Sequence, residues 1–410
     1  MNAAQEFNTS TEVPTAAAKA RRLGKLAAVA GLTTMMMLGT VAVAASASAA
    51  PVTIPVTQYA ACTGGDDTTG LKTAIAALKT GDTLSIPAGV TCRHADVLDI
   101  KTPGVHLSGP GTLVATNEAR SAVWLNADNI TVEGGLTLKA INVTQRWNAT
   151  QQHKLWLANN HTGITVQDTT IDGSAAAGIF INGASNFTLT RVTVLNSRAD
   201  GIHMTNGSYN GIVKDATVRG AGDDGVAVVS YLSNPVATHD IQVINPKVYS
   251  NTWGRGVSVV GGYNITYSGI YVEASNAAAV YIVQTSAKDG VAASWDTHNV
   301  DNVKVLGGTL VNSNTNASVN NGAIVLAAGG PTGHTITNVT MSNLTIKNTR
   351  STAARNVGIF TYDGGTVSNI AFTGFKITGG PVKYFDTNST GGYSTTNWTV
   401  NGATVPNKTA

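Results

Sequence analysis

Charged residues and cysteines are scarce in this sequence, and each scarcity excludes a class of function. Only 12% of the 410 residues are charged, and without residues 1–49 the chain keeps 22 basic and 21 acidic side chains. A net charge this close to zero argues against nucleic acid as a partner. The only cysteines are Cys62 and Cys92. In an exported chain, a single pair indicates a disulfide rather than a metal site or a redox centre.

Long hydrophobic runs are also missing, with one exception near the start of the chain. Residues 1–49 contain a basic segment, an apolar core and a small-residue cleavage site: Lys19, Arg21, Arg22 and Lys25, then 26–45, then Ala47–Ala49. This order is typical of an export signal. The apolar run is also long enough for an uncleaved membrane anchor, and the arginine pair also permits twin-arginine export. We expect cleavage near Ala50, a secreted extracellular protein and no membrane contact afterwards.

Helical periodicity is rare as well, and only one segment predicts a helix. Within residues 66–81, apolar residues recur with the spacing of one helical face, at Leu71, Ala74, Ile75 and Leu78. Residues 66–69 offer N-cap side chains, and Gly81 is expected to end the helix. We interpret residues 50–82 as an N-terminal cap, whose helix covers the unpaired strands at the end of a β-structure.

Short runs of Val, Ile and Thr are abundant, and they recur at a fixed period. Two sets of residues repeat with steps of 24, 30 and 24 residues: Val194, Val218, Val248 and Val272, and Asn186, Asn210, Asp240 and Asn264. A period of this size, with Gly and Asn between strand-forming runs, is typical of a solenoid built from β-strands. The sequence therefore predicts an all-β fold, a β-helix, in which residues one period apart stack about 4.8 Å from each other.

The strand-like runs continue from residue 83 to about residue 385, which we interpret as the β-helix domain, with 386–410 as a C-terminal cap. Predicted strands include 105–107, 130–132, 164–166, 303–305, 336–339 and 370–372. Two irregular stretches, 144–155 and 285–300, interrupt the pattern and contain Trp147 and Trp295. Loops of a solenoid commonly build its binding face. These tryptophans would either stack on sugar rings or pack within their loops.

Three aspartates stand at one point of the repeat. Asp200 precedes a glycine, Asp223 and Asp224 lie between two glycines, and Asp224 is 24 residues after Asp200. Arg255, also between glycines, takes the same place 31 residues later. Stacked coils would bring these side chains into one column, where two carboxylates about 5 Å apart repel by roughly 3 kcal/mol. One of them should keep its proton near neutral pH, as the general acid of a glycosidase requires.

These motifs resemble those of glycoside hydrolase family 28, the polygalacturonases, whose coils carry N-T-D, (G/Q)-D-D, G-H-G and R-I-K in succession. The matching segments are 199–201, 222–225, 254–256 and 281–283. The resemblance implies a catalytic domain that is a single-stranded, right-handed parallel β-helix of the pectin-lyase-like type, and it implies hydrolysis with inversion. By position, Asp223 would be the general acid, and Asp200 and Asp224 would activate the water.

Two departures from family 28 concern the substrate. Arg255 replaces the histidine, and Tyr281-Ile282-Val283 replaces the R-I-K segment, whose cations receive the uronate carboxylate in polygalacturonases. The stretches GDDGVAVVSY and WGRGVSVVGG are more similar to the family 87 α-1,3-glucanases and mycodextranases, which are implied to act on neutral glucans. We therefore expect a secreted, endo-acting α-glucanase, with a pectin-active polygalacturonase as the alternative.

Four residues beside the aspartates are candidates for substrate contact: Arg255, His203, Trp253 and Tyr281. Arg255 would hold the aspartate cluster or contact a sugar hydroxyl. His203 follows Asp200 by three residues, and it either faces the groove or is an ordinary exposed histidine. The expected partner is a polysaccharide, bound by a monomer that needs no cofactor.

Two other functions fit parts of the pattern. In a polysaccharide lyase, the aspartates would bind calcium through oxygen ligands, and Arg255 would be the base; the adjacent G-D-D-G placement favours the hydrolase. In a non-enzymatic cell-surface or carbohydrate-binding β-helix, the aspartates would only be turn residues. Three aspartates on one face within two coils are more than turns require.

Overall fold

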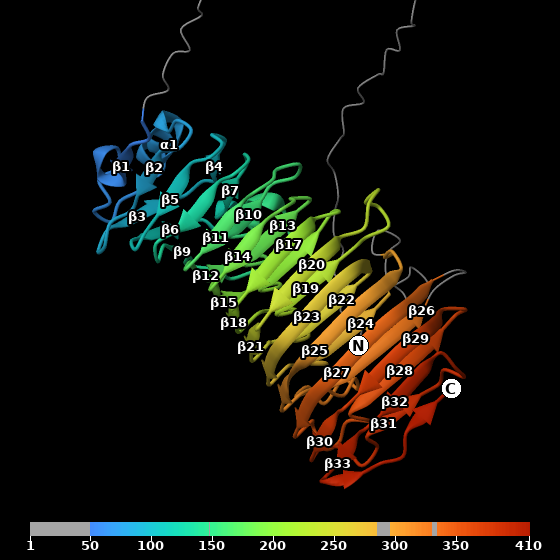
Figure 1. Ribbon diagram of the computed structural model, residues 1–410. Coiled ribbons are helices and arrows are strands. Elements are labelled where there is room, and N and C mark those ends of the chain that lie inside the picture. The colour runs from blue at the N-terminus through green and yellow to red at the C-terminus, as the bar shows by residue number, and fades with distance from the viewer. Residues whose placement is uncertain (1–49, 147, 285–295, 330–333) are drawn as a thin grey trace, which may run out of the picture. The chain divides into compact units, whose positions relative to one another are not determined.

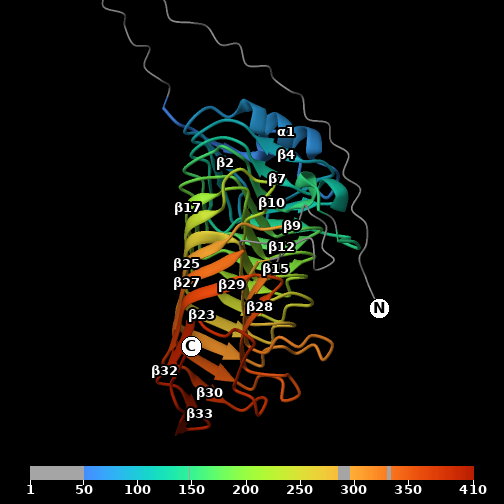
Figure 2. The same cartoon turned by 90° about the vertical axis from the view of Figure 1, so that its right-hand side faces the viewer.

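The strands of this protein are short, mostly parallel and stacked in register. The computed structural model describes residues 50–146, 148–284, 296–329 and 334–410. The predicted export signal, Trp147 and Trp295 lie outside these ranges. Residues 50–410 form one unit, in which successive turns of the chain stack from α1 at the N-terminal end to β33 at the C-terminal end (Figures 1 and 2).

The strands belong to two hydrogen-bonded sheets, one of 11 and one of 24 strands. The 11-stranded sheet contains, along the stack, β4 (Leu98–Ile100), β7 (Val123–Leu125), β10 (Leu155–Leu157), β13 (Ile179–Asn182), β16 (Ile202–Thr205), β19 (Val226–Val229), β22 (Val257–Val260), β24 (Val280–Val283), β26 (Ile324–Gly329), β28 (Val357–Tyr362) and β31 (Phe385–Thr387). Every pair in this sheet is parallel.

The 24-stranded sheet begins as two ladders that merge in the long strands β23 (Gly262–Glu273), β25 (Val300–Val311) and β27 (Thr335–Lys347). One ladder contains β1 (Thr53–Pro55), β2 (Thr83–Ser85), β5 (His106–Ser108), β8 (Thr131–Glu133), β11 (Thr165–Gln167), β14 (Thr188–Thr190), β17 (Tyr209–Lys214), β20 (His239–Ile244), β29 (Thr366–Thr373) and β32 (Tyr393–Thr396). The other contains β3 (Thr91–His94), β6 (Thr112–Ala115), β9 (Thr137–Ala140), β12 (Thr170–Ser174), β15 (Thr193–Ser197), β18 (Thr217–Arg219), β21 (Lys247–Tyr249), β30 (Lys376–Thr378) and β33 (Thr399–Val400). At the C-terminal end, β34 (Ala403–Thr404) and β35 (Lys408–Thr409) pair antiparallel to β33 and β32.

Each coil thus has three sides, and the periodic residues occupy the positions that the repeat predicts. The four valines are buried and pair in succession across β15, β18, β21 and β23. The four polar residues all have φ between 49° and 56°, the left-handed region that Asn and Asp tolerate. Their side chains bond along the stack, as when Asn264 Nδ2 donates to Asp240 Oδ1 at 2.9 Å. The fold is therefore the predicted parallel β-helix.

The predicted helix is α1 (Thr68–Ala77), the single α-helix among the described residues, and it lies at the N-terminal end of the stack (Figure 2). Leu71, Ala74 and Ile75 form its buried face. The helix ends before Gly81 because Leu78 already has an extended backbone. The part of the chain that the structure describes also forms three 3-10 turns: η1 (Val56–Gln58), η2 (Glu118–Arg120) and η3 (Thr150–Gln152). No helix in the described ranges is long and apolar enough to cross a membrane.

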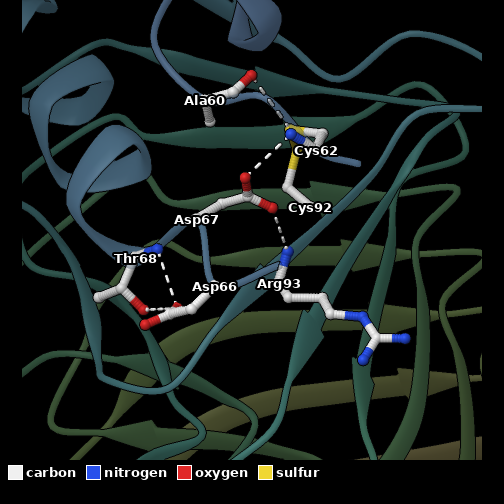
Figure 3. The surroundings of a disulfide bond; sticks show 7 residues. All are labelled: Ala60, Cys62, Asp66, Asp67, Thr68, Cys92 and Arg93. Atoms are coloured by element: carbon white, nitrogen blue, oxygen red, sulfur yellow. Dashed lines mark hydrogen bonds between the residues drawn. A yellow bond between two sulfur atoms is a disulfide. The ribbon is translucent and has the colours of Figure 1, made fainter. Parts of the chain in front are cut away.

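The predicted disulfide joins Cys62 to Cys92 (Figure 3). Asp67, the N-cap residue of α1, does not cap the helix with its side chain. Its carboxylate instead accepts the backbone N–H groups of Cys62 and Arg93, each at 2.9 Å. The disulfide and Asp67 therefore fasten the segment before α1 to strand β3.

Replacing Cys62 and Cys92 together by serine is expected to lower the free energy of unfolding by about 3 kcal/mol. The disulfide closes a loop of 30 residues, and without it the unfolded chain gains conformational freedom. Urea unfolding of the variant and the wild type would measure the difference, with wild type in reducing agent as the control. Equal unfolding midpoints in all three samples would contradict a stabilising disulfide.

Candidate active site

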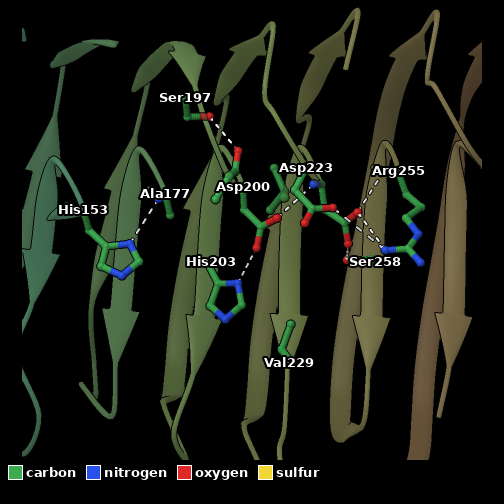
Figure 4. Close-up of polar contacts among 12 residues, drawn as sticks. His153, Ala177, Ser197, Asp200, His203, Asp223, Val229, Arg255 and Ser258 are labelled. Carbon is green, nitrogen blue, oxygen red and sulfur yellow. Dashed lines mark hydrogen bonds and ion pairs between the residues drawn. The ribbon is translucent and has the colours of Figure 1, made fainter. Parts of the chain in front are cut away.

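Asp200, Asp224 and Arg255 lie in one column because each stands two residues before a strand of the 11-stranded sheet. Ile202 in β16 pairs with Val226 in β19, and Val226 pairs with Val257 in β22. The register therefore places the three side chains on successive coils, as the spacing predicts. Figure 4 shows Asp200, Asp223 and Arg255 along this column. Asp223 precedes Asp224 and joins the cluster from the same turn. One carboxylate oxygen from each of the three aspartates lies within 4.8 Å of the others, close enough to hold a cation.

Hydrogen bonds along the column fix two of the carboxylates. Asp200 Oδ1 accepts the backbone N–H of Asp224 at 2.9 Å, and Asp224 Oδ1 accepts the backbone N–H of Arg255 at 2.8 Å. The Ser258 hydroxyl donates to Asp224 Oδ2 at 2.5 Å. Each coil thus holds the carboxylate of the coil before it, so these side chains are oriented before any substrate arrives.

The glycines that follow the aspartates are required by packing. A side chain at Gly201 would place its Cβ 2.4 Å from a methyl group of Val218 and 2.6 Å from the Gly225 carbonyl oxygen. A side chain at Gly225 would meet Val248 in the same way, at 2.4 Å. The D-G pairs in the sequence therefore arise because each aspartate sits at a tight corner, where the next residue faces the core.

Asp223 differs from the other two carboxylates in its partners. Its Oδ2 accepts a hydrogen bond from Arg146 Nη2 at 2.6 Å. Its Oδ1 is buried and has no hydrogen-bond partner among the described residues. This oxygen lies against Gly254, where an added Cβ would be only 2.4 Å away. The hydrogen bond to the Asp223 carboxyl group thus comes from a distant part of the chain.

Burial first, and then the carboxylates of Asp200 and Asp224, raise the pKa of Asp223 to about 8, against the opposing charges of Arg146 and Arg255. Burial also raises the pKa of Asp224, while Arg255 and the Ser258 hydroxyl lower it. A carboxyl that keeps its proton near neutral pH was predicted from charge repulsion. In the structure burial is the largest cause, and it raises the pKa of both Asp223 and Asp224.

Arg255 is engaged with protein groups on both sides. Its Nη1 lies 3.5 Å from Asp224 Oδ1, and its guanidinium stacks 4.1 Å from the centre of the Tyr281 ring. Although burial opposes it, the carboxylate of Asp224 holds the pKa of Arg255 above its ordinary value. Arg255 therefore stays charged and pairs with Asp224, and the Tyr281 ring packs against its guanidinium from the next coil.

His203 is buried, so the expectation of an ordinary exposed histidine is wrong. Its Nδ1 hydrogen-bonds to Asp200 Oδ2. Its ring stacks on Phe180, with ring centres 4.6 Å apart. Its buried Nε2 has no hydrogen-bond partner among the described residues. The structure therefore places His203 where it orients Asp200.

Trp253 is 57% exposed and stands at the edge of the site. The guanidinium carbons of Arg146 and Arg255 lie 5.8 and 5.9 Å from the centre of its ring. An exposed indole beside an acid cluster is suited to stacking on a sugar ring. Trp253 thus fits its predicted role in substrate contact better than Tyr281, whose face is occupied by Arg255.

The sequence analysis did not identify two residues of the site, Arg146 and Tyr231. Arg146 lies in the irregular stretch 144–155, which was predicted to form a wall of the groove. Tyr231 follows β19, and burial together with the carboxylates of the three aspartates raises its pKa. Its backbone pairs with Thr297, across the second irregular stretch. Neither residue lies in a periodic run. The one feature of the sequence that could have indicated them is their position as polar residues in or beside an irregular stretch.

Comparison with known proteins gives the same class of fold. The family model described as "Right handed beta helix region" matches residues 121–294. The catalytic domain of a GH87 α-1,3-glucanase in complex with nigerose superposes with a TM-score of 0.62 at 17% identity, covering 86% of this chain and 65% of that chain. The catalytic unit of the GH87 α-1,3-glucanase from Streptomyces thermodiastaticus gives 0.57 at 19% identity, covering 84% and 70%. The fold is a right-handed parallel β-helix, as predicted.

The same fold also occurs in PfbA, a surface adhesin of Streptococcus pneumoniae, with a TM-score of 0.58 at 14% identity, covering 85% of this chain and 90% of that chain. By sequence, the chain is similar to two polygalacturonases. That of Penicillium griseoroseum is 25% identical, covering 84% of this chain and 93% of the relative, and that of Cochliobolus carbonum is 27% identical, covering 72% and 82%. The resemblance to polygalacturonase-like β-helix hydrolases is confirmed, and the relatives indicate a glycosidase.

Proposed function

We propose that this protein is a secreted glycosidase that hydrolyses a neutral α-glucan containing 1,3-linkages. The observation that carries the proposal is the difference among three neighbouring carboxyl groups. Asp223 has a pKa of about 8 and therefore holds a proton at neutral pH. Asp200 lies beside it and accepts hydrogen bonds from the Asp224 N–H and from His203, which orient its carboxyl group. A protonated carboxyl beside an ionised one is the acid and base pair of a glycosidase.

In this mechanism, Asp223 donates its proton to the glycosidic oxygen as the bond from that oxygen to the anomeric carbon breaks. A water molecule attacks the anomeric carbon, and its proton passes to the Asp200–Asp224 pair. The products are two shorter chains, one with a new reducing end. Asp223 then takes up a proton from solvent and the Asp200–Asp224 pair releases the one it received, which restores both groups for the next cycle without a cofactor.

We also propose inversion at the anomeric carbon and attack within the polysaccharide chain rather than at its end. Both rest on the family resemblance alone. The aspartate oxygens lie within 4.8 Å of one another. This spacing is closer to the separation of about 5 Å that is typical of retaining glycosidases than to that of inverting ones. Proton NMR of the first product, which distinguishes the two anomers, decides between inversion and retention.

A neutral substrate is supported by what occupies the two cation positions of the R-I-K segment. At the first position, the Tyr281 ring stacks against Arg255, and at the second, Val283 is buried. The two guanidinium groups at the site, those of Arg146 and Arg255, already pair with Asp223 and Asp224. A uronate carboxylate would have to break one of these pairs, whereas a glucose ring needs only stacking and hydroxyl contacts.

The wild-type protein is expected to release oligosaccharides from an α-1,3-glucan and little from polygalacturonate. The expectation follows from the neutral positions 281 and 283. Reducing-end assays on a panel of α-glucans and pectins would measure it, with a chelator added in parallel. Strong depolymerisation of polygalacturonate without action on glucans would overturn the glucanase proposal and favour the polygalacturonase that the sequence relatives suggest.

The same panel tests the two remaining alternatives. A lyase forms unsaturated products that absorb ultraviolet light, and a calcium-dependent one stops when a chelator is added; we expect neither result. Arg255 is a poor base for a lyase, because Asp224 holds its proton on. A binding protein like the structurally similar adhesin would bind a glycan and release no reducing ends.

Export is the remaining part of the proposal. The predicted signal in residues 1–49, the disulfide and the extracellular nature of polysaccharide substrates support it. Intact-mass analysis of protein from the culture medium should show a chain that begins near Ala50 and contains no free thiol.

A further inference from the structure

Arg146 comes to the site on a segment that is fastened to the β-helix at two points. Glu118 accepts the backbone N–H of Thr144 at 2.6 Å and the Thr144 hydroxyl at 2.9 Å. Arg198, on the coil of Asp200, donates to the Val143 carbonyl oxygen at 2.8 Å. The segment is therefore held at Val143 and Thr144, directly before Arg146, whose guanidinium reaches Asp223.

The two oxygens of Asp223 are not equivalent toward a substrate. Oδ1 is buried against Gly254, while the side chain as a whole is 13% exposed. This leaves Oδ2 as the oxygen that a glycosidic oxygen can reach. Oδ2 is also the oxygen that accepts the hydrogen bond from Arg146. An oxygen of a carboxyl group has more than one acceptor position, so Oδ2 can hold its proton and keep the Arg146 contact.

We propose that Arg146 is a positioning residue of the reaction, which holds Asp223 Oδ2 toward the glycosidic bond and stabilises the negative charge left there when the proton departs. The inference rests on the proposed function. Before proton transfer, Arg146 faces a neutral carboxyl group, and afterwards it faces a carboxylate. A hydrogen bond between charged groups is stronger than one to a neutral group, so the contact strengthens toward the transition state and accelerates the reaction.

The surrounding charges leave this task to Arg146. On the coils of the cluster itself, Asp223 faces Asp200 and Asp224, both acidic, and Arg255 Nη1 at 4.0 Å from the buried Oδ1. Tyr231 faces the cluster from the segment after β19, and His203 is bonded to Asp200. Among the described residues, Arg146 is the cation that contacts Oδ2.

The test compares Arg146→Gln and Arg146→Lys with the wild type. For Arg146→Gln we expect kcat on the polysaccharide to fall about 10- to 100-fold, the range that one hydrogen bond to a charged group supplies. Loss of the cation also raises the pKa of Asp223, so the alkaline limb of the kcat profile should move to higher pH. Arg146→Lys keeps the charge and should leave the limb near its wild-type position.

Substrate and control variants separate this role from a structural one. On an activated aryl glycoside, whose leaving group needs little protonation, Arg146→Gln should lower kcat far less than on the polysaccharide. The matched control is Arg191→Gln, which removes an exposed arginine that lies between β14 and β15, with its Nε 2.6 Å from Asp168 Oδ1. This variant should change neither kcat nor the pH profile.

Three results would overturn the inference. The alkaline limb of Arg146→Gln could stay in place, both substrates could slow equally, or Arg146→Lys could behave like the glutamine variant. Failure of the proposed function looks different, because the wild type itself would then release no reducing ends from an α-1,3-glucan. Thermal unfolding of each variant verifies that the fold is intact.

Discussion

Asp223→Asn is expected to lower kcat on the polysaccharide by about 10²- to 10⁴-fold, the usual effect of losing a general acid. Asparagine has nearly the same shape as aspartic acid, and its oxygen can still accept the hydrogen bond from Arg146. What it lacks is a proton that it can donate to the glycosidic oxygen. The loss should therefore appear in kcat, measured from initial rates of reducing-end formation, with a smaller change in KM.

The pH profile gives this variant a second signature. A general acid works only while protonated, so wild-type kcat should fall as the pH rises through about 8, the pKa of Asp223. Asp223→Asn should remove this alkaline limb and leave the acidic limb, which reports protonation of the base carboxylates. On an activated aryl glycoside that the site accepts, the variant should recover most of its activity. No recovery would show that Asp223 is not the acid.

Asp224→Asn is expected to slow the polysaccharide and the activated substrate alike, also by at least 10²-fold. Asp224 takes part in activating the water, and a good leaving group does not replace a missing base. The buried column should survive the change, because asparagine still offers an oxygen to the Arg255 N–H, which donates to Asp224 Oδ1 at 2.8 Å in the wild type. Asp200→Asn should behave similarly.

Ser258→Ala is the matched control for Asp224→Asn. It removes the hydroxyl that donates to Asp224 Oδ2 and leaves the carboxylate in place. Because Ser258 only supports the base, its loss should reduce activity much less than the loss of the carboxylate. If the activated substrate restores Asp224→Asn but not Asp223→Asn, the two roles are reversed, and the family correspondence has been carried over one residue out of place.

The coil repeat and the column of ionisable residues could be predicted from the sequence. In a β-helix each strand pairs with the strand one coil later, so a residue's neighbour is set by the period. For this reason the steps of 24 and 30 residues predicted the valine stack, and those of 24 and 31 predicted Asp200 beside Asp224 beside Arg255. The cysteine pair was also predictable, because two cysteines in an exported chain have only each other as partners.

The residues that surround the column could not be predicted from the repeat, because they depend on packing in three dimensions. Arg146 reaches Asp223 across 77 residues, from a segment without a repeat whose position depends on Glu118 and Arg198. The burial of His203 and the pKa of Asp223 depend on which atoms cover them, and no spacing encodes that. A periodic strand makes contacts that the register fixes, whereas an irregular segment makes contacts that only packing in three dimensions selects. The sequence therefore could not predict that Arg146 pairs with the proposed acid, Asp223.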